Sequence, residues 1–395
     1  MAKRLKKINK GLVAFLCVIA LIFGAALGYA AKTFVFTTTY EIPATVKKPA
    51  FSSGTGYAAE HIKEYDLSVH FIELGNKYTG DCTFIKVGKT EILIDAGSRQ
   101  SSVNAICDYV TPYIEDGLDY VIVTHAHQDH YAGFATSENV ESVFDKLKPK
   151  TVIKFAHTNQ KKSKDPNKPN LFDNFNRELK ETVENNGTKV FTAMECYAET
   201  KTGAQRVYPL ASGVELEILY QKYYEQAAKT ENDYSVCAMI NQTTSDGVYR
   251  YLFTGDLEKD GEESLAESNN LGTVKLYKAG HHGSKTSSSE KLLAAIKPEV
   301  VCVCACAGSS EYTFKNENQF PTQEFIDRVA VYTEKVYVTS LCVDYEKGEF
   351  TSMNGNIVYS AKKDGKTKMY FSASDTPLYL TDWFKSNRTA PQQWQ

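Results

Sequence analysis

The stretch DYVIVTHAHQDH (residues 119–130) determines how the fold of this 395-residue chain is interpreted. Its first half is a short run of β-branched and aromatic residues, which predicts a buried strand. Its second half places three of the chain's eight histidines within six residues, directly after that strand. Side chains that follow the carboxyl end of a strand project into a loop where ligand sites are commonly built. The stretch therefore predicts a metal or catalytic site at the rim of a sheet.

The polar residues of this stretch have the spacing of ligands to two neighbouring cations. His125 and His127, two residues apart, can face one ion, and Asp129 and His130 can face a second. Imidazole and carboxylate together suit zinc, manganese or iron, and two such ions about 3.5–4 Å apart hold a bridging hydroxide. We therefore expect a centre with two divalent metal ions, zinc or manganese.

Two later segments add polar residues to this centre. YLFTGDLE (residues 251–258) is a predicted strand that ends in a glycine–aspartate turn, and the carboxylate of Asp256 can bridge two metals. An ordinary turn is the alternative interpretation of that pair. In LYKAGHHGSKTSSS (residues 276–289) a strand delivers two adjacent histidines to a glycine and a run of hydroxyl side chains. That run can receive an oxyanion.

These three segments, in this order, resemble the metallo-β-lactamase superfamily, and within it the hydrolase domain of the DNA-uptake competence protein ComEC. The shared marks are a THxHxDH strand end, a Gly-Asp strand end and the HHGSKTS run. The resemblance extends to HFIELGNKYTGDCTFI (70–85), LIDAG (93–97) and NDYSVCAMI (232–240), and covers roughly residues 67–360. It implies an α/β fold of the αββα sandwich type, with the site along one edge between two sheets.

The resemblance also implies a role for each polar residue. The residues implied as metal ligands are His125 and His127 for one ion, Asp129, His130 and His281 for the other, and Asp256 between the two. The residues implied to act on the substrate are Asp129, which takes or orients a proton, and His282, Ser284 and Lys285, which face the scissile group. Asp95 and Asp81 would orient ligand imidazoles from outside, with turn-forming aspartates as the alternative.

This chain departs from the broader superfamily at one histidine. That residue usually precedes the strand before Gly-Asp, but no histidine occurs between His157 and His281. Asn232-Asp233 stands in its place, so either Asp233 ligates the first metal or that ion is weakly held. We expect His157 to be structural, and His61 and His70 not to be ligands.

The amino terminus carries a separate signal. Five basic residues within positions 1–10 precede Gly11–Ala31, which is 21 residues long and has no charge. As a helix it would span roughly 32 Å, the thickness of a hydrocarbon core. The basic flank should stay in the cytoplasm, so we expect a single-pass membrane anchor with the rest of the chain outside. A cleaved signal peptide, ending near Gly28-Tyr29-Ala30, is the alternative and would give a secreted protein.

Changes in composition and in hydrophobic periodicity along the chain predict its division into segments. We expect an anchor over 1–31, a linker over 32–65, the hydrolase domain over 66–380 and a tail over 381–395. Alternating strands and helices from Leu67 onward predict two sheets covered by helices, including a helix from Gly133 to near Lys148 and strands up to about residue 380. The nine cysteines form no CxxC pair, so small buried apolar side chains are the favoured role.

Bulk charge does not indicate a nucleic-acid binder. Without the five basic residues of the amino terminus, 40 basic residues face 48 acidic ones, a net charge of −8. A phosphodiester substrate, whether DNA, a nucleotide or a wall polymer, must therefore be attracted by metal ions or by a local patch. A ComEC-type channel also has many membrane spans, and this chain has one at most, so the DNA-import role does not come with the motif.

The predicted reaction is metal-assisted hydrolysis. Metal ions lower the pKa of a bridging water to near neutral, and the hydroxide attacks phosphorus or a carbonyl carbon. A phosphodiesterase or nuclease is favoured because a loop with hydroxyl groups and a lysine suits a tetrahedral anion. The alternatives are a β-lactamase-like or other ester or amide hydrolase, and a degenerate binding module without catalysis.

Overall fold

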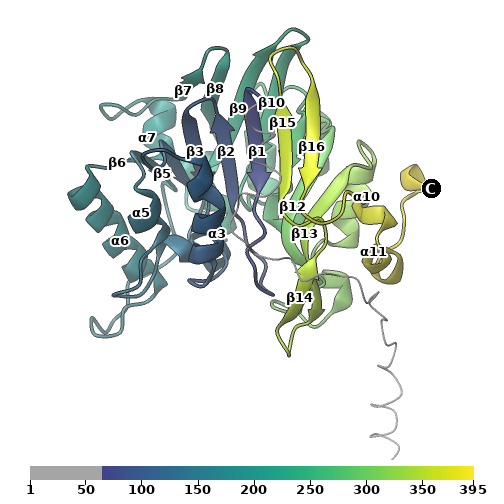
Figure 1. Ribbon diagram of the computed structural model, residues 1–395, viewed down its shortest axis with the longest axis horizontal. Coiled ribbons are helices and arrows are strands. Elements are labelled where there is room, and N and C mark those ends of the chain that lie inside the picture. The colour runs from purple at the N-terminus through teal and green to yellow at the C-terminus, as the bar shows by residue number, and fades with distance from the viewer. Residues whose placement is uncertain (1–64) are drawn as a thin grey trace, which may run out of the picture. The chain divides into compact units, whose positions relative to one another are not determined.

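Two eight-stranded sheets packed face to face organise residues 65–395, the part of the chain that this computed structural model describes. Helices cover the outer face of each sheet (Figure 1). The helices over the first sheet are α3 (Ser102–Val110), α5 (Val143–Leu147) and α6 (Leu171–Asn186). The helices over the second sheet are α8 (Lys259–Ser268), α9 (Glu290–Ile296), α10 (Gln323–Ala330) and α11 (Asp382–Asn387). The predicted α/β fold with two sheets is confirmed.

The first sheet has the order β16-β15-β1-β2-β3-β4-β5-β6. Strands β3 to β6 run parallel to one another, and the other neighbours are antiparallel. Its strands are β1 (Leu67–Phe71), β2 (Thr83–Val87), β3 (Thr90–Ile94), β4 (Tyr120–Val123), β5 (Thr151–Lys154), β6 (Lys189–Thr192), β15 (Ile357–Ala361) and β16 (Thr367–Phe371).

The second sheet has the order β14-β13-β12-β11-β10-β9-β8-β7. Strands β10 to β13 are parallel, and the other neighbours are antiparallel. Its strands are β7 (Val207–Ala211), β8 (Val214–Leu219), β9 (Cys237–Thr244), β10 (Gly247–Phe253), β11 (Leu276–Lys278), β12 (Val300–Ala307), β13 (Val336–Asp344) and β14 (Glu349–Ser352).

Strand β12 shows how the sequence fills both cores. All eight of its residues are buried. Cys302 and Cys304 face the core between the sheets, whereas Val301 and Val303 face the core under the helices of the second sheet. Small sulfur side chains therefore act as apolar packing here. No cysteine of residues 65–395 belongs to a cluster that could bind a metal, and those present are free thiols.

The carboxyl ends of parallel strands from both sheets meet at one rim. Asp95 follows β3, Thr124 and His125 follow β4, and Asp256 comes shortly after β10. The backbone N–H of Val236, just before β9, donates to the carbonyl oxygen of Thr124 at 3.0 Å and ties the two sheets together there. Ligand sites of α/β sheets lie beyond the carboxyl ends of their strands, so this rim is where the site is expected.

Two predicted elements differ from the structure. Of the helix expected from Gly133 to near Lys148, only α5 is α-helical; the range begins in a 3₁₀ turn (Ala132–Phe134), which follows the short helix α4 (Gln128–Tyr131), and residues 135–142 are not helical. A side chain at Gly133 would lie 2.6 Å from the carbonyl oxygen of Ala96, so the chain is pressed against the end of β3 before a capping box at Ser142 starts α5. The strands predicted up to about residue 380 end at Phe371; residues 372–377 are irregular, and Leu378–Leu380 form a 3₁₀ turn.

The two ends of the chain differ in what the structure describes. The predicted anchor and all but the last residue of the predicted linker lie outside the described residues. Within residues 65–395, no helix combines the length and the apolar character needed to cross a bilayer. At the other end, the segment predicted as a tail packs on the second sheet, with Trp383, Phe384 and Trp394 buried.

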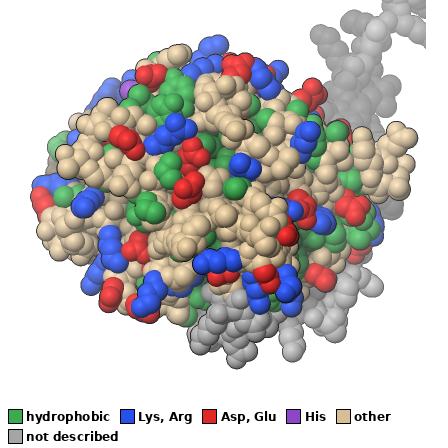
Figure 2. All heavy atoms as spheres, turned by 90° about the horizontal axis from the view of Figure 1, so that it is seen from above, with side chains coloured by type: hydrophobic (Ala, Val, Ile, Leu, Met, Phe, Trp, Pro, Cys, Tyr) green, Lys and Arg blue, Asp and Glu red, His purple; other side chains and the backbone are tan. Residues whose placement is uncertain are grey.

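Surface charge is mixed. Figure 2 shows one face of the molecule on which basic and acidic side chains are interspersed. That face has no continuous basic surface, in line with the acidic balance of the sequence.

Candidate metal centre

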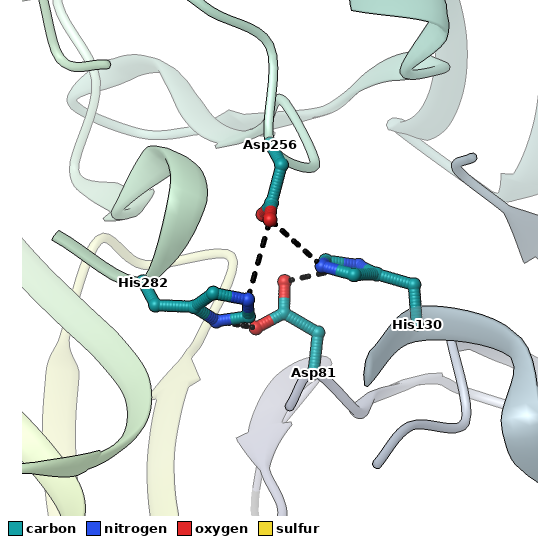
Figure 3. A group of neighbouring side chains, drawn as sticks. All are labelled: Asp81, His130, Asp256 and His282. Atoms are coloured by element: carbon teal, nitrogen blue, oxygen red, sulfur yellow. Dashed lines mark ion pairs between the residues drawn. The ribbon is translucent and has the colours of Figure 1, made fainter. Parts of the chain in front are cut away.

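Four buried side chains, those of Asp81, His130, Asp256 and His282, bring ligand atoms within 4.8 Å of one another at the rim, and Asp129 lies beside them. Nε2 of His130 lies 3.0 Å from Oδ2 of Asp256, and Nε2 of His282 lies 3.2 Å from the same oxygen. Nε2 of His282 is also 3.3 Å from Oδ2 of Asp129. Figure 3 shows Asp256 facing both rings. Two imidazoles and two carboxylates in this arrangement form a donor set suited to a divalent cation such as zinc or manganese.

Asp81 and Asp95 contact the opposite nitrogens of the same two rings. Nδ1 of His130 bonds Oδ2 of Asp95 at 2.8 Å and is 3.6 Å from Asp81. Nδ1 of His282 is 3.2 Å from Oδ1 of Asp81 and 2.9 Å from the carbonyl oxygen of Cys304. Figure 3 shows Asp81 reaching these outer nitrogens. Asp81 is close enough to the other three residues to be a metal ligand. Its oxygens, however, contact Nδ1 of each ring, on the side away from Asp256, which is the orienting role that we expected of Asp81.

Lys278, the last residue of β11, supplies a buried positive charge. Its ammonium group pairs with the carboxylate of Asp81 and lies 3.6 Å from Oδ1 of Asp256. It also donates to the carbonyl oxygen of Gly255 at 3.1 Å. An unpaired buried carboxylate is costly, so Lys278 stabilises the ionised form of Asp81 behind the histidines.

A second pair of imidazoles lies beside this cluster. Nε2 of His125 and Nδ1 of His127 are 3.1 Å apart, and the rings of His125 and His130 have centroids 4.2 Å apart. Nδ1 of His125 contacts the hydroxyl oxygens of Thr124 at 3.1 Å and Ser235 at 3.3 Å. These two nitrogens can face a common ion, but hydroxyl groups rather than carboxylates support His125.

Asp233 does not face these two histidines. Its carboxylate accepts hydrogen bonds from the backbone N–H of Glu258 and the hydroxyl of Thr230, both at 3.3 Å. The residue that reaches His125 from this segment is Ser235, whose hydroxyl also accepts from the backbone N–H of Asp256 at 3.0 Å. The structure therefore gives no support to Asp233 as a replacement ligand.

The structure places the two adjacent histidines of the HHGSKTS run in different environments. His282 is fully buried and joins the cluster, whereas the side chain of His281 is 20% exposed. Nε2 of His281 is 4.0 Å from Oδ2 of Asp256, and its Nδ1 bonds the hydroxyl of Thr286 at 3.0 Å. The inward position that the resemblance gave to His281 is thus held by His282. Both residues have positive φ angles, 47° and 55°, a tight turn that sends neighbouring side chains in different directions.

Ser284 and Lys285 lie away from the cluster. The hydroxyl of Ser284 pairs with that of Thr286 at 3.1 Å. The ammonium of Lys285 donates to the side-chain oxygen of Asn318 at 2.8 Å. After Gly283 the chain turns toward α9, so these two side chains do not face the point where the four donors converge.

Tyr312 is a site residue that the sequence did not indicate. Its hydroxyl donates to Oδ2 of Asp129 at 2.6 Å, across 183 residues of sequence. The residue is 55% exposed, and its ring packs beside Phe320 with centroids 5.9 Å apart. A single tyrosine in a polar loop is not part of any recognisable motif, so the sequence alone does not identify Tyr312 as a site residue.

Electrostatics at the cluster favour a bound cation. Burial alone would lower the pKa of His130, but the carboxylates of Asp256, Asp81 and Asp95 outweigh it and raise that pKa to about 10. Burial would raise the pKa of Asp256, yet His130 and His282 hold it well below its usual range. Although Nε2 of His130 is 3.0 Å from Oδ2 of Asp256, neither of these atoms makes a hydrogen bond, and neither does Oδ1 of Asp256. A divalent ion would satisfy these atoms and replace the protons on the imidazoles, so the residues fit a metal.

The remaining described histidines lie elsewhere. His70 is buried, and its nitrogens bond the hydroxyls of Tyr109 at 2.8 Å and Ser68 at 2.9 Å. Burial lowers the pKa of His70 to about 3, so it is a neutral packing residue. His157 is exposed, with its ring 6.0 Å from that of Tyr234. His61 lies outside the described residues.

Comparisons with known proteins agree with the motifs. Residues 75–141 match the sequence model of the metallo-beta-lactamase superfamily. Recombination protein 2 of Haemophilus influenzae is 31% identical over 113 residues, and Competence protein ComA of Neisseria gonorrhoeae is 40% identical over 92 residues. The matched segments are 29% and 23% of this chain but 13% and 12% of those proteins, so the chain matches a small part of each relative.

A solved structure is similar at lower sequence identity. The metallo-beta-lactamase fold protein YhfI from Bacillus subtilis aligns over 77% of this chain and 99% of its own length, with 12% identity and a TM-score of 0.39.

The superfamily match and the two curated relatives confirm the resemblance that the sequence motifs predicted.

Proposed function

We propose that this chain is a metal-dependent phosphodiesterase or nuclease of the ComEC-like type, within the metallo-β-lactamase superfamily whose sequence model matches residues 75–141. The observation that supports the proposal most strongly is the convergence of Nε2 of His130 and His282 on one oxygen of Asp256, at 3.0 and 3.2 Å. Because Nδ1 of each ring contacts a carboxylate or a carbonyl oxygen, Nε2 is the nitrogen of each ring that can bind a metal ion.

The residues that would hold the more buried ion are His130, His282, Asp129 and Asp256. A divalent cation bound there would lower the pKa of a coordinated water toward neutrality and would polarise a phosphoryl oxygen. Asp95 and Asp81 fix the rings through Nδ1, which leaves Nε2 as the electron-pair donor. Asp129 would also orient a proton of the attacking water. His125 and His127 would hold a second ion.

A groove beside the centre provides a path for an extended substrate. It has a volume of about 660 Å³, and the residues that line it include Glu258, Lys285, Thr286 and Arg328. Thr286 and Glu258 also contact Nδ1 of His281, at 3.0 and 3.6 Å, so the groove begins at the rim of the cluster. The lining mixes five basic and five acidic side chains with hydroxyl groups. The lysines, the arginine and the hydroxyl groups would contact the phosphates of a phosphodiester chain, whether DNA, a nucleotide or a wall polymer.

We further propose that the hydrolase acts outside the cytoplasm, held to the membrane by residues 11–31. The support is the uncharged run of 21 residues with its basic flank. A protease added to intact cells should remove the hydrolase domain, and protection of the domain would contradict this location. Release into the medium would instead favour the cleaved signal.

Hydrolysis of bis(p-nitrophenyl) phosphate by the purified full-length chain tests the activity. The chain stripped with a chelator should be inactive and should regain turnover with manganese or zinc. Asp256→Asn should lower kcat/KM by about 10³-fold, because the carboxylate shared by both imidazoles is lost. Asp364→Asn is the matched control, since this exposed residue lies in the β15–β16 turn, at the opposite end of the strands.

Three results would contradict the proposal. Full activity after chelation would exclude a metal-dependent reaction. Hydrolysis of a chromogenic β-lactam without hydrolysis of the phosphodiester would favour the β-lactamase-like alternative. Metal binding with no hydrolysis of either compound, or of DNA, would favour a binding module.

A further inference from the structure

We propose that Tyr312 is a catalytic residue that faces the substrate, and that its hydroxyl donates a hydrogen bond to a non-bridging phosphoryl oxygen in the transition state. This inference rests on the proposed function and adds a residue to it. The hydroxyl keeps its proton throughout, and no bond to the tyrosine oxygen is made or broken.

Tyr312 connects the reacting centre with the surface. Its hydroxyl is 2.6 Å from Oδ2 of Asp129, the oxygen that also lies 3.3 Å from Nε2 of His282. The residue is nevertheless 55% exposed, whereas Asp129 is 8% exposed and His282 is fully buried. Tyr312 therefore has its hydroxyl beside the converging donors while part of the residue is open to solvent, and we expect an incoming ligand to approach the hydroxyl from that side.

The loop that carries Tyr312 is fixed on both sides of it. The carboxylate of the preceding residue, Glu311, accepts from the backbone N–H of Thr79 at 2.9 Å and pairs with Arg99 at 2.6 Å. Further along the loop, Phe320 packs against the rings of His281 and His282, with centroids 5.6 and 5.7 Å apart. A donor held in place before the substrate arrives requires little reorganisation during the reaction.

The position of the hydroxyl favours the substrate as its partner during catalysis. Oδ2 of Asp129 accepts the hydrogen bond of Tyr312 and also lies close to Nε2 of His282. A cation bound to this oxygen would therefore compete with the tyrosine hydroxyl for it. A phosphoryl group bound to the cation brings anionic oxygens to the same place. Because negative charge on those oxygens grows in the transition state, the hydrogen bond is stronger there than in the ground state.

Two substitutions separate this role from a structural one. Tyr312→Phe removes the hydroxyl and keeps the ring, so it should lower kcat on bis(p-nitrophenyl) phosphate by about 10²-fold, with a change in KM of less than about threefold. Its affinity for manganese or zinc, measured by calorimetric titration of the stripped chain, should stay within about twofold of the unsubstituted chain. Tyr120→Phe is the matched control, because this half-buried tyrosine begins β4 at the end away from the site.

Each other outcome overturns the inference. If Tyr312→Phe keeps full kcat, the hydroxyl does not act on the substrate. If it lowers metal affinity by about 10–100-fold and kcat recovers at saturating metal, the tyrosine only orients Asp129. An unsubstituted chain that binds metal and hydrolyses no phosphodiester contradicts the proposed function and this inference together. An active chain with an equally active Tyr312→Phe variant contradicts this inference alone.

Discussion

The two groups of imidazoles at the rim are supported by different chemistry. His130 and His282 are buried and have carboxylates or a backbone carbonyl against their outer nitrogens, with Lys278 balancing Asp81 behind them. His125 has only hydroxyl groups of Thr124 and Ser235 at its outer nitrogen. A carboxylate behind an imidazole raises its basicity and fixes its orientation, whereas a hydroxyl does so less strongly. We therefore expect the first group to bind a divalent ion tightly and the second to bind one more weakly.

The largest expected effect separates the two groups directly. His282→Ala should abolish binding of the tighter ion and lower kcat/KM by about 10³-fold or more, since two carboxylates lose the imidazole between them. His127→Ala should remove the weaker ion alone and leave one ion per chain. Elemental analysis of the two variants after dialysis measures this difference. Loss of both ions in His127→Ala, or of neither in His282→Ala, would show that the two groups are not distinct.

A smaller loss of metal affinity is expected when the residues that contact Nδ1 of the imidazoles, or that neutralise those residues, are changed. Asp81→Asn should weaken binding of the tighter ion by about 10–100-fold, because the ring of His282 loses its charged partner. Lys278→Met should act in the same direction, while Lys154→Met, a half-buried lysine on β5, serves as the control. Metal titration against a competing chelator gives the affinities. Unchanged affinity in both variants would mean that the carboxylate contributes only to the fold.

The smallest effect is a difference in pH dependence between the two ions. Because the carboxylates raise the pKa of His130 to about 10, metal must displace a proton there below that pH. Affinity for the tighter ion should therefore rise about tenfold per pH unit from 6.5 toward 10 for each proton displaced. Burial and the charge of His130 hold the pKa of His125 well below its usual value, so its ion should bind with little pH dependence over that interval.

The same pKa affects the stability of the metal-free chain. A histidine with a raised pKa in the folded state stabilises the fold fully below pH 6.5 and loses this contribution as the pH rises through about 10. Urea unfolding of the stripped chain across that interval should show decreasing stability. Stability that increases with pH there would contradict protonation of His130 in the metal-free state.

Much of the fold and part of the site could be predicted from the sequence. Short apolar runs followed by histidine or aspartate mark the strand ends at the rim, and period-2 alternation in β12 marks its two buried faces. These local patterns place His130 and Asp256 correctly at one rim because parallel strands end there. The non-helical start of the helix predicted from Gly133 could not be read from the sequence, since it depends on contact between Gly133 and the residues that follow β3.

The remaining site features depend on tertiary contacts. Sequence spacing cannot distinguish His281 from His282, because adjacent residues on a left-handed turn point in different directions. Tyr312 meets Asp129 through a loop whose course is set by Glu311 and its partners on another segment. Neither feature has a period or a spacing that a sequence pattern could reveal.

Anomalous diffraction from crystals of the full-length chain soaked in zinc tests the central claim most directly. We expect the stronger peak among Nε2 of His130, Nε2 of His282 and the carboxylate of Asp256, and a weaker peak beside His125 and His127. A zinc peak at other residues, with none at the imidazoles of His130 and His282, would contradict the assignment of the metal centre and the hydrolytic function built on it.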